Sequence, residues 1–248
     1  GGIVLVCIGV VIGLLAGGGI KPASSRAPEE SKPDTVMASE TGTLQESEEE
    51  TLQAPPEEVL LEVDAHPEVN TLMAQYYQAV TERIKELTDL TDNDEEALTY
   101  YVKRSIYLEA YQDLKCYTKV GPIEGSYVVY VSYNVKFREL EPLVPGVSPF
   151  LVCPRGDGSL YIHEGTVDEN VNEYLEEISI QDDVVDLMNE IQVKYNNALA
   201  DETVNYYLAK MKEEVKVAVG EALAEAKTEQ ANEDEQQQAS NESDQSGL

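Results

Sequence analysis

The chain has 248 residues, of which 48 are acidic and 17 are basic, so its formal net charge is −31 at pH 7. Nucleic-acid binding requires clustered Lys and Arg side chains that displace counterions from phosphates. The sequence has no such cluster, so we expect no nucleic-acid partner. A polycation, a divalent metal ion or a basic protein patch is compatible with the charge, whose simplest role is to keep the chain soluble and extended.

Residues 1–20 form an apolar segment without a single charge. About twenty such residues span a hydrocarbon core of roughly 30 Å, so we expect a transmembrane helix that anchors a single-pass protein in the cell membrane. A cleaved signal peptide is the alternative, but it normally ends in an A-x-A-like site, and no good site occurs before Pro22. Because the sequence begins with Gly1 rather than Met, we expect a cytoplasmic flank to precede the anchor.

Residues 21–66 are rich in Pro, Ser, Thr and Glu. Such a segment cannot bury enough apolar surface to offset its ordering entropy, so we expect a disordered acidic linker. A flexible chain of about 45 residues reaches roughly 35–40 Å, which holds the following domain away from the membrane. A large acidic domain is compatible with export, and we therefore expect it to be extracytoplasmic.

Residues 67–167 are predicted to form the folded domain, and their first part is helical. Apolar side chains recur at every third or fourth position from Val69 to Leu87, which predicts a long amphipathic helix. Polar residues then interrupt the pattern. Asp94 is a candidate N-cap for a second helix that runs to Ile106.

The apolar period then changes to that of strands. Residues 111–120 and 126–140 predict two strands, and alternate residues from Tyr127 to Phe137 predict one fully buried face. The following segment predicts a loop with Pro142, Pro145, Gly146 and Pro149, then a hairpin of residues 150–153 and 159–163 closed by Arg155, Gly156, Asp157 and Gly158. This order predicts an α+β fold in which an antiparallel sheet wraps around a long N-terminal helix.

Four segments of this domain carry a family resemblance, namely 111–119, 125–131, 146–150 and 157–162. They resemble the NTF2-like (cystatin-like) α+β domains of membrane-anchored proteins from clostridial Firmicutes. The resemblance covers about residues 67–165 and rests on packing and turn signatures. It implies an NTF2-like fold and an extracytoplasmic location, but no activity. The third helix that NTF2-like domains usually place after the first strands is not evident here.

The remainder of the chain returns to helix. Apolar stripes in residues 168–227 predict a C-terminal helical segment, with breaks near Gln181 and Asp201. The stripes are too short and interrupted for a coiled coil, so we expect them to pack within the chain, with pairing to another chain as the alternative. Residues 228–248 are rich in Gln, Asn, Glu and Ser and predict a disordered tail.

Tyrosines and one histidine are the candidate ligand-binding residues. Trp is absent and Phe occurs twice, so the 15 Tyr residues carry the aromatic packing. Tyr101, Tyr127 and Tyr133 lie on the predicted inner face and can line a pocket for an apolar or sugar ligand, with simple core packing as the alternative. His163 closes the last strand beside Glu164, where it is a candidate ligand-binding residue or general base.

No catalytic constellation, cofactor motif or metal site is predicted. Neither Cys-x-x-Cys nor His-x-x-x-His occurs. Residues 91–96 offer oxygen ligands but lack the central Gly of a calcium loop. The Arg155–Asp157 triplet that integrins recognise falls where a hairpin turn is needed. Cys116 and Cys153 can pair in an oxidising compartment or serve as small core residues.

These observations lead to one functional hypothesis and two alternatives. The hypothesis is a membrane-anchored extracytoplasmic module that binds an envelope protein or a small ligand without catalysing a reaction. The first alternative is an NTF2-like hydrolase or isomerase that uses His163 in a pocket. The second is a structural spacer that oligomerises through the C-terminal helices. The sequence leaves the ligand and the oligomeric state open.

Overall fold

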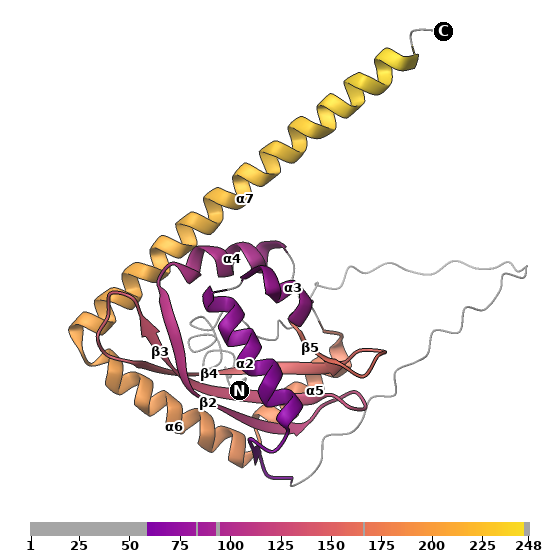
Figure 1. Ribbon diagram of the computed structural model, residues 1–248. Coiled ribbons are helices and arrows are strands. Elements are labelled where there is room, and N and C mark those ends of the chain that lie inside the picture. The colour runs from indigo at the N-terminus through magenta and orange to yellow at the C-terminus, as the bar shows by residue number, and fades with distance from the viewer. Residues whose placement is uncertain (1–58, 83, 93–94, 166, 246–248) are drawn as a thin grey trace, which may run out of the picture.

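The computed structural model describes residues 59–245, apart from residues 83, 93, 94 and 166 (Figure 1). The anchor predicted at residues 1–20 and most of the predicted linker lie outside the described residues, so both stay predictions. Within the described part of the chain, no helix is long and apolar enough to cross a membrane.

Three helices precede the long strands: α2 spans Pro67–Glu82, α3 spans Leu87–Leu90 and α4 spans Glu95–Ser105. Helix α2 begins with Pro and carries Glu68 in its first turn, and both features favour a helix N-terminus. The single helix predicted to reach Leu87 instead ends at Glu82, and a 3₁₀ turn at Ile84–Glu86 leads into α3. Asp94, the predicted cap of α4, lies outside the described residues.

The helices pack on a five-stranded antiparallel sheet. Its strands lie side by side in chain order: β1 (Glu62–Val63), β2 (Leu108–Val120), β3 (Tyr127–Phe137), β4 (Val144–Pro154) and β5 (Leu160–His163). The predicted α+β class with an antiparallel sheet is therefore confirmed. Strand β1 falls within the predicted linker, where Glu62 pairs with Thr118, so the ordered part of the chain begins before residue 67.

Strand β4 begins earlier than predicted. The sequence predicts a loop through Pro145, Gly146 and Pro149, but these residues pair with β3. Strand β5 pairs only with Leu151–Pro154, so the first half of β4 has a neighbouring strand on one side only. The loop prediction is wrong because proline is tolerated in such an edge segment, where its missing N–H can face away from the ladder.

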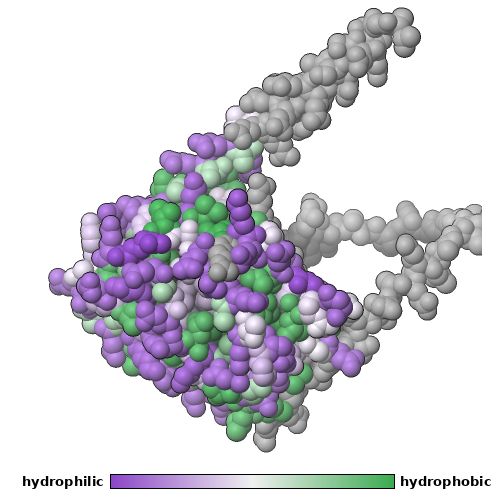
Figure 2. All heavy atoms as spheres, in the orientation of Figure 1, coloured by the Kyte–Doolittle hydropathy of each residue, from purple (hydrophilic) through white to green (hydrophobic). Residues whose placement is uncertain are grey.

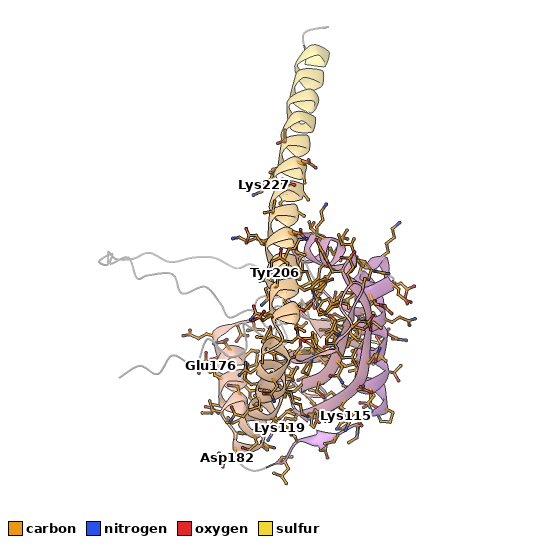
Figure 3. All side chains as sticks on the ribbon, turned by 90° about the vertical axis from the view of Figure 1, so that its left-hand side faces the viewer. Lys115, Lys119, Glu176, Asp182, Tyr206 and Lys227 are labelled. Atoms are coloured by element: carbon orange, nitrogen blue, oxygen red, sulfur yellow. The ribbon has the colours of Figure 1, made fainter. Side chains whose placement is uncertain are left out.

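The predicted C-terminal helices are α5 (Glu169–Ser179), α6 (Asp182–Leu199) and α7 (Glu202–Gln245). Their boundaries confirm the predicted breaks near Gln181 and Asp201. Helix α7 packs on α4 and then runs away from the domain, so that Lys227 lies well beyond the sheet (Figures 1 and 3). The helix continues to Gln245 where the sequence predicts a disordered tail, because the Ala, Glu and Gln residues of this segment are good helix formers.

Both faces of the sheet are buried. On one face, β3 residues such as Val129, Val131 and Phe137 pack with α2, α4 and the first half of α7. In Figure 1, α2 crosses the sheet on this face. On the other face, Val128 and Tyr130 pack with α5 and α6. The alternation predicted for this strand is therefore confirmed.

The two described cysteines lie on opposite sides of the sheet. Cys116 belongs to the core under α2, whereas Cys153 belongs to the core under α5 and α6. They form no disulfide with each other, because the sheet separates their side chains. Both therefore act as buried core residues, the second of the two interpretations that the sequence left open.

Candidate functional site

A groove opens at the end of the sheet where the β2–β3 and β4–β5 turns approach α2 and α3. Its volume is about 920 Å³. The lining residues are Pro67, Glu68, Thr71, Leu72, Gln75, Asp89, Leu90, Gly125, Tyr127, Pro154, Arg155, Gly158, Ser159 and Leu160. The face that carries α2 is covered mainly by hydrophilic side chains, with small apolar areas between them (Figure 2).

Of the charged groups that line the groove, Arg155 contacts neighbouring residues, whereas Glu68 and Asp89 are exposed. The Arg155 guanidinium donates a hydrogen bond of 3.0 Å to the Asp89 backbone carbonyl and lies 5.0 Å from the centroid of the Tyr161 ring. These contacts keep the Arg155 guanidinium close to the β4–β5 hairpin and α3. The carboxylates of Glu68 and Asp89 are largely exposed, so the groove presents a predominantly acidic rim.

Tyr127 is the one predicted ligand-binding residue that lines the groove. Its ring packs against His66 at a centroid separation of 4.6 Å, and its hydroxyl donates a long, 3.5 Å hydrogen bond to Glu68 Oε1. Burial and the neighbouring Glu68 carboxylate raise the pKa of Tyr127, so its hydroxyl is a neutral donor at the groove wall.

Tyr101 belongs instead to a closed hydrogen-bonded cluster in the core. Its hydroxyl donates to Glu164 Oε1 at 2.6 Å, and the Tyr76 hydroxyl reaches the same oxygen at 3.1 Å. The two hydroxyls are 2.9 Å apart. Burial, followed by the Glu164 charge, raises the pKa of both phenols well above the ordinary tyrosine value. These phenols therefore stay protonated and satisfy a buried carboxylate.

Tyr133 lies in the same core, within a group of rings that meet in tilted or edge-to-face contacts. Its ring centroid is 5.3 Å from that of Tyr77 and 5.1 Å from that of Tyr111, and its hydroxyl is 3.1 Å from Ser148 Oγ. Beside this group lies the side chain of Arg104, which is buried. We call Tyr76, Tyr77, Tyr101, Tyr111 and Tyr133 the tyrosine cluster.

His163 lies at the edge of β5, outside the lining of the groove. Its Nδ1 atom is hydrogen-bonded to Asp92 Oδ2, and its side chain is 22% exposed. The other Asp92 oxygen accepts the backbone N–H of Glu164 at 2.6 Å. The carboxylate beside His163 is thus Asp92, while Glu164 turns to the opposite side and enters the core.

The four predicted ligand-binding residues therefore do not converge. Tyr101 and Tyr133 are core residues, Tyr127 is in the groove and His163 is at a strand edge. Sequence reasoning did not select Arg104 as a buried group. Its position three residues after Tyr101 on one helical face was the available signal.

The described residues include no group of three or more His, Cys, Asp or Glu side chains that could hold a metal ion. No family model, curated protein or solved structure matches the chain. The groove and the buried polar core are therefore interpreted from their own geometry.

Proposed function

We propose that this chain is a membrane-tethered, extracytoplasmic binding module that holds an extended segment of a partner protein in the groove without catalysing a reaction. The groove carries this proposal, because it is open, shaped by two turns and two helices, and bounded by apolar residues such as Leu72, Leu90 and Leu160. The apolar segment at residues 1–20 is the proposed anchor. The long helix packed across an antiparallel sheet supports an NTF2-like relationship for the domain.

The acidic rim selects a basic partner. Glu68 and Asp89 present exposed carboxylates, whereas the Arg155 charge is already held by the hairpin. The net charge of −31 steers basic segments toward the domain and repels acidic ones. The partner segment is therefore an extended stretch that combines apolar side chains with Lys or Arg.

An enzymatic role has weaker support. Among the described residues that line the groove there is no histidine or cysteine, so the groove lacks the commonest general base and the commonest thiol nucleophile. The His163–Asp92 pair lies outside it, and Asp92 also anchors the backbone of Glu164. This pair is therefore better explained as a contact that ties the α3–α4 connection to β5.

The test uses the full chain in nanodiscs of zwitterionic phosphatidylcholine and fluorescent twelve-residue peptides. One peptide alternates Lys with Leu and the other alternates Glu with Leu. Fluorescence anisotropy should detect binding of the Lys peptide alone. Because a basic peptide can also bind elsewhere on an acidic protein, variants of one helix decide the location.

Thr71→Trp places a large side chain in the groove, whereas Gln78→Trp places it at an exposed position on the same helix outside the lining. We expect Thr71→Trp to weaken binding at least tenfold and Gln78→Trp to leave it unchanged. Equal binding by the two variants would refute the groove as the binding site. Turnover of an envelope substrate that His163→Ala abolishes would favour the enzymatic alternative.

A further inference from the structure

His66 lies between two carboxylates at the point where the chain enters α2. Its Nε2 atom is 2.8 Å from Glu62 Oε2, and its Nδ1 atom is 3.7 Å from Glu68 Oε1. The imidazole side chain is 25% exposed, so it can exchange a proton with the solvent. A proton on the ring places a positive charge beside both carboxylates. Histidine is the residue type that gains or loses its charge between pH 5 and 8.

The contacts of His66 place its ring at the wall of the groove. Glu68 and Tyr127 line the groove, and so does Pro67, the residue that follows His66. The His66 and Tyr127 rings are 4.6 Å apart between centroids, and the Tyr127 hydroxyl donates to Glu68 Oε1. Burial, followed by the Glu68 charge, raises the pKa of Tyr127, so this phenol stays neutral. The titratable groups that face the ring are therefore Glu62 on β1, Glu68 on α2 and Tyr127 on β3.

We propose that His66 makes the groove a pH-dependent receptor, which holds its basic partner segment more tightly when the His66 ring is neutral. This inference rests on the function proposed above for the groove. A protonated ring offsets the charges of Glu62 and Glu68, and so weakens their attraction for Lys and Arg side chains of the partner. A neutral ring leaves both carboxylates to the partner. Binding therefore strengthens as the pH rises from 5.5 to 7.5.

The size of the change follows from one unit of charge at the groove wall. In water, the interaction of two unit charges about 4 Å apart changes an equilibrium constant about fivefold. The Glu62 and Glu68 side chains are more than half exposed, so salt screens their interactions with a ligand. We expect the affinity for the Lys–Leu peptide to rise about threefold to fivefold between pH 5.5 and 7.5 at low salt. The rise should become smaller as salt is added.

Reciprocity between the two ligands gives a second signature. Because the proton and the basic segment compete for the same carboxylates, binding of the peptide near pH 6.5 should release protons from the protein. Calorimetry of one titration in two buffers that differ in ionisation enthalpy measures this release. A histidine that only positions the start of α2 would release none.

The chain contains two histidines, His66 and His163, and each can be replaced in turn. His163 lies outside the groove lining, where its Nδ1 atom is hydrogen-bonded to Asp92, so His163→Gln is the matched control. Fluorescence anisotropy follows the N-acetylated Lys–Leu peptide on the full chain, without a histidine tag, in phosphatidylcholine nanodiscs at pH 5.5, 6.5 and 7.5.

The three variants have different expected outcomes. His66→Gln should bind the peptide equally at all three pH values, and about as tightly as the wild type at pH 7.5. His66→Lys carries a permanent charge and should bind at all three as weakly as the wild type at pH 5.5. His163→Gln should keep the wild-type dependence on pH.

Two results would overturn the inference, and they differ in what they say of the groove. If the wild type and His66→Gln show the same pH dependence, His66 does not regulate the groove, although the groove still binds the peptide. If the wild type binds no peptide at any pH, the proposed function fails together with the inference. The release of protons is measured on the wild type, so its absence during peptide binding overturns the inference even where a variant does not fold.

Discussion

Replacing Lys119 with Met should loosen the point where the chain enters the domain. The Lys119 side chain is 2% exposed and lies between the sheet and the start of α6 (Figure 3). Its ammonium group donates to the Val59 carbonyl at 2.6 Å, to Gln181 Oε1 at 2.6 Å and to Asp183 Oδ1 at 2.8 Å. Asp183 Oδ2 in turn accepts the Leu61 N–H at 2.7 Å. One buried lysine thus joins the entering segment to the α5–α6 connection.

The size of the effect follows from these contacts. Removing one member of a buried ion pair costs about 3–5 kcal/mol because the other charge is left unpaired. Asp183 is 20% exposed, and it keeps the hydrogen bonds from the Leu61 and Val184 backbone N–H groups. Water can therefore restore part of its solvation, and Met preserves the apolar contacts of the lysine stem. We expect a loss of about 2–3 kcal/mol in the free energy of unfolding, toward the lower end of the effect of breaking a buried pair.

The assay is urea unfolding of the full chain in detergent, with Lys115→Met as the control. Lys115 lies on the same strand but is exposed, and substitutions at such positions usually change stability by less than about 0.5 kcal/mol. Hydrogen exchange should show faster exchange of the Leu61 amide in Lys119→Met alone. The reasoning is refuted if the two variants unfold at the same urea concentration.

The same ion pair gives a pH dependence. Burial opposes the charge of Asp183, but the Lys119 and backbone hydrogen bonds outweigh it and lower the Asp183 pKa below its ordinary value of 3.8. A carboxyl group with a lowered folded-state pKa contributes stability above its unfolded pKa, and this contribution is lost as the pH falls through the folded pKa. Below about pH 4, the free energy of unfolding should therefore fall more steeply for the wild type than for Lys119→Met. Parallel curves between pH 2 and 6 would contradict this explanation.

Three further outcomes are expected. Burial, followed by the Asp64 charge, raises the pKa of Cys116 to about 12. Cys116 should therefore resist iodoacetamide at pH 8 in the native protein and react after unfolding, as mass spectrometry can show. Gly146→Ala should lower the free energy of unfolding by about 1–3 kcal/mol, because the new Cβ would lie 2.4 Å from a ring carbon of Tyr133. The control Gly156→Ala meets nothing within 4 Å and should leave urea unfolding unchanged. Tyr101→Phe should cost about 1.5–3 kcal/mol by loss of a hydrogen bond to a buried carboxylate, and a cost below 0.5 kcal/mol would contradict the buried network.

The parts of the fold that sequence reasoning could predict depend on local patterns. The alternation along β3 predicts a face buried along its whole length, and capping residues predict the breaks between the C-terminal helices. The prolines of β4 were predicted to lie in a loop. That prediction is wrong because the neighbouring strands determine whether a strand tolerates proline. Strand β1 has two residues, and only its pairing with β2 makes it a strand. Neither feature can be predicted from the local sequence, because both depend on a neighbouring strand.

The candidate site was harder to predict for a related reason. The partner of His163 is Asp92, which lies 71 residues earlier in the chain, so adjacency to Glu164 suggested the wrong carboxylate. Burial of Arg104 likewise depends on tertiary packing, in which its guanidinium on α4 contacts Tyr111 on β2. A core built from tyrosine rather than phenylalanine must place hydroxyls, and those hydroxyls need partners. That requirement explains why charged groups lie in this core, although it does not identify them from sequence.

One short stretch of chain connects the Lys119 contact to the groove. Lys119 donates a hydrogen bond to the carbonyl of Val59, and β1 follows at Glu62–Val63. The His66 ring then packs on Tyr127. Pro67 is the first residue of α2 and also lines the groove. Only a few residues therefore separate the Lys119 contact from the groove wall. If the lysine contact fixes that wall, Lys119→Met should weaken capture of the Lys–Leu peptide while Lys115→Met leaves it unchanged. Equal affinities in the two variants would show that α2 holds the groove without help from the entering segment.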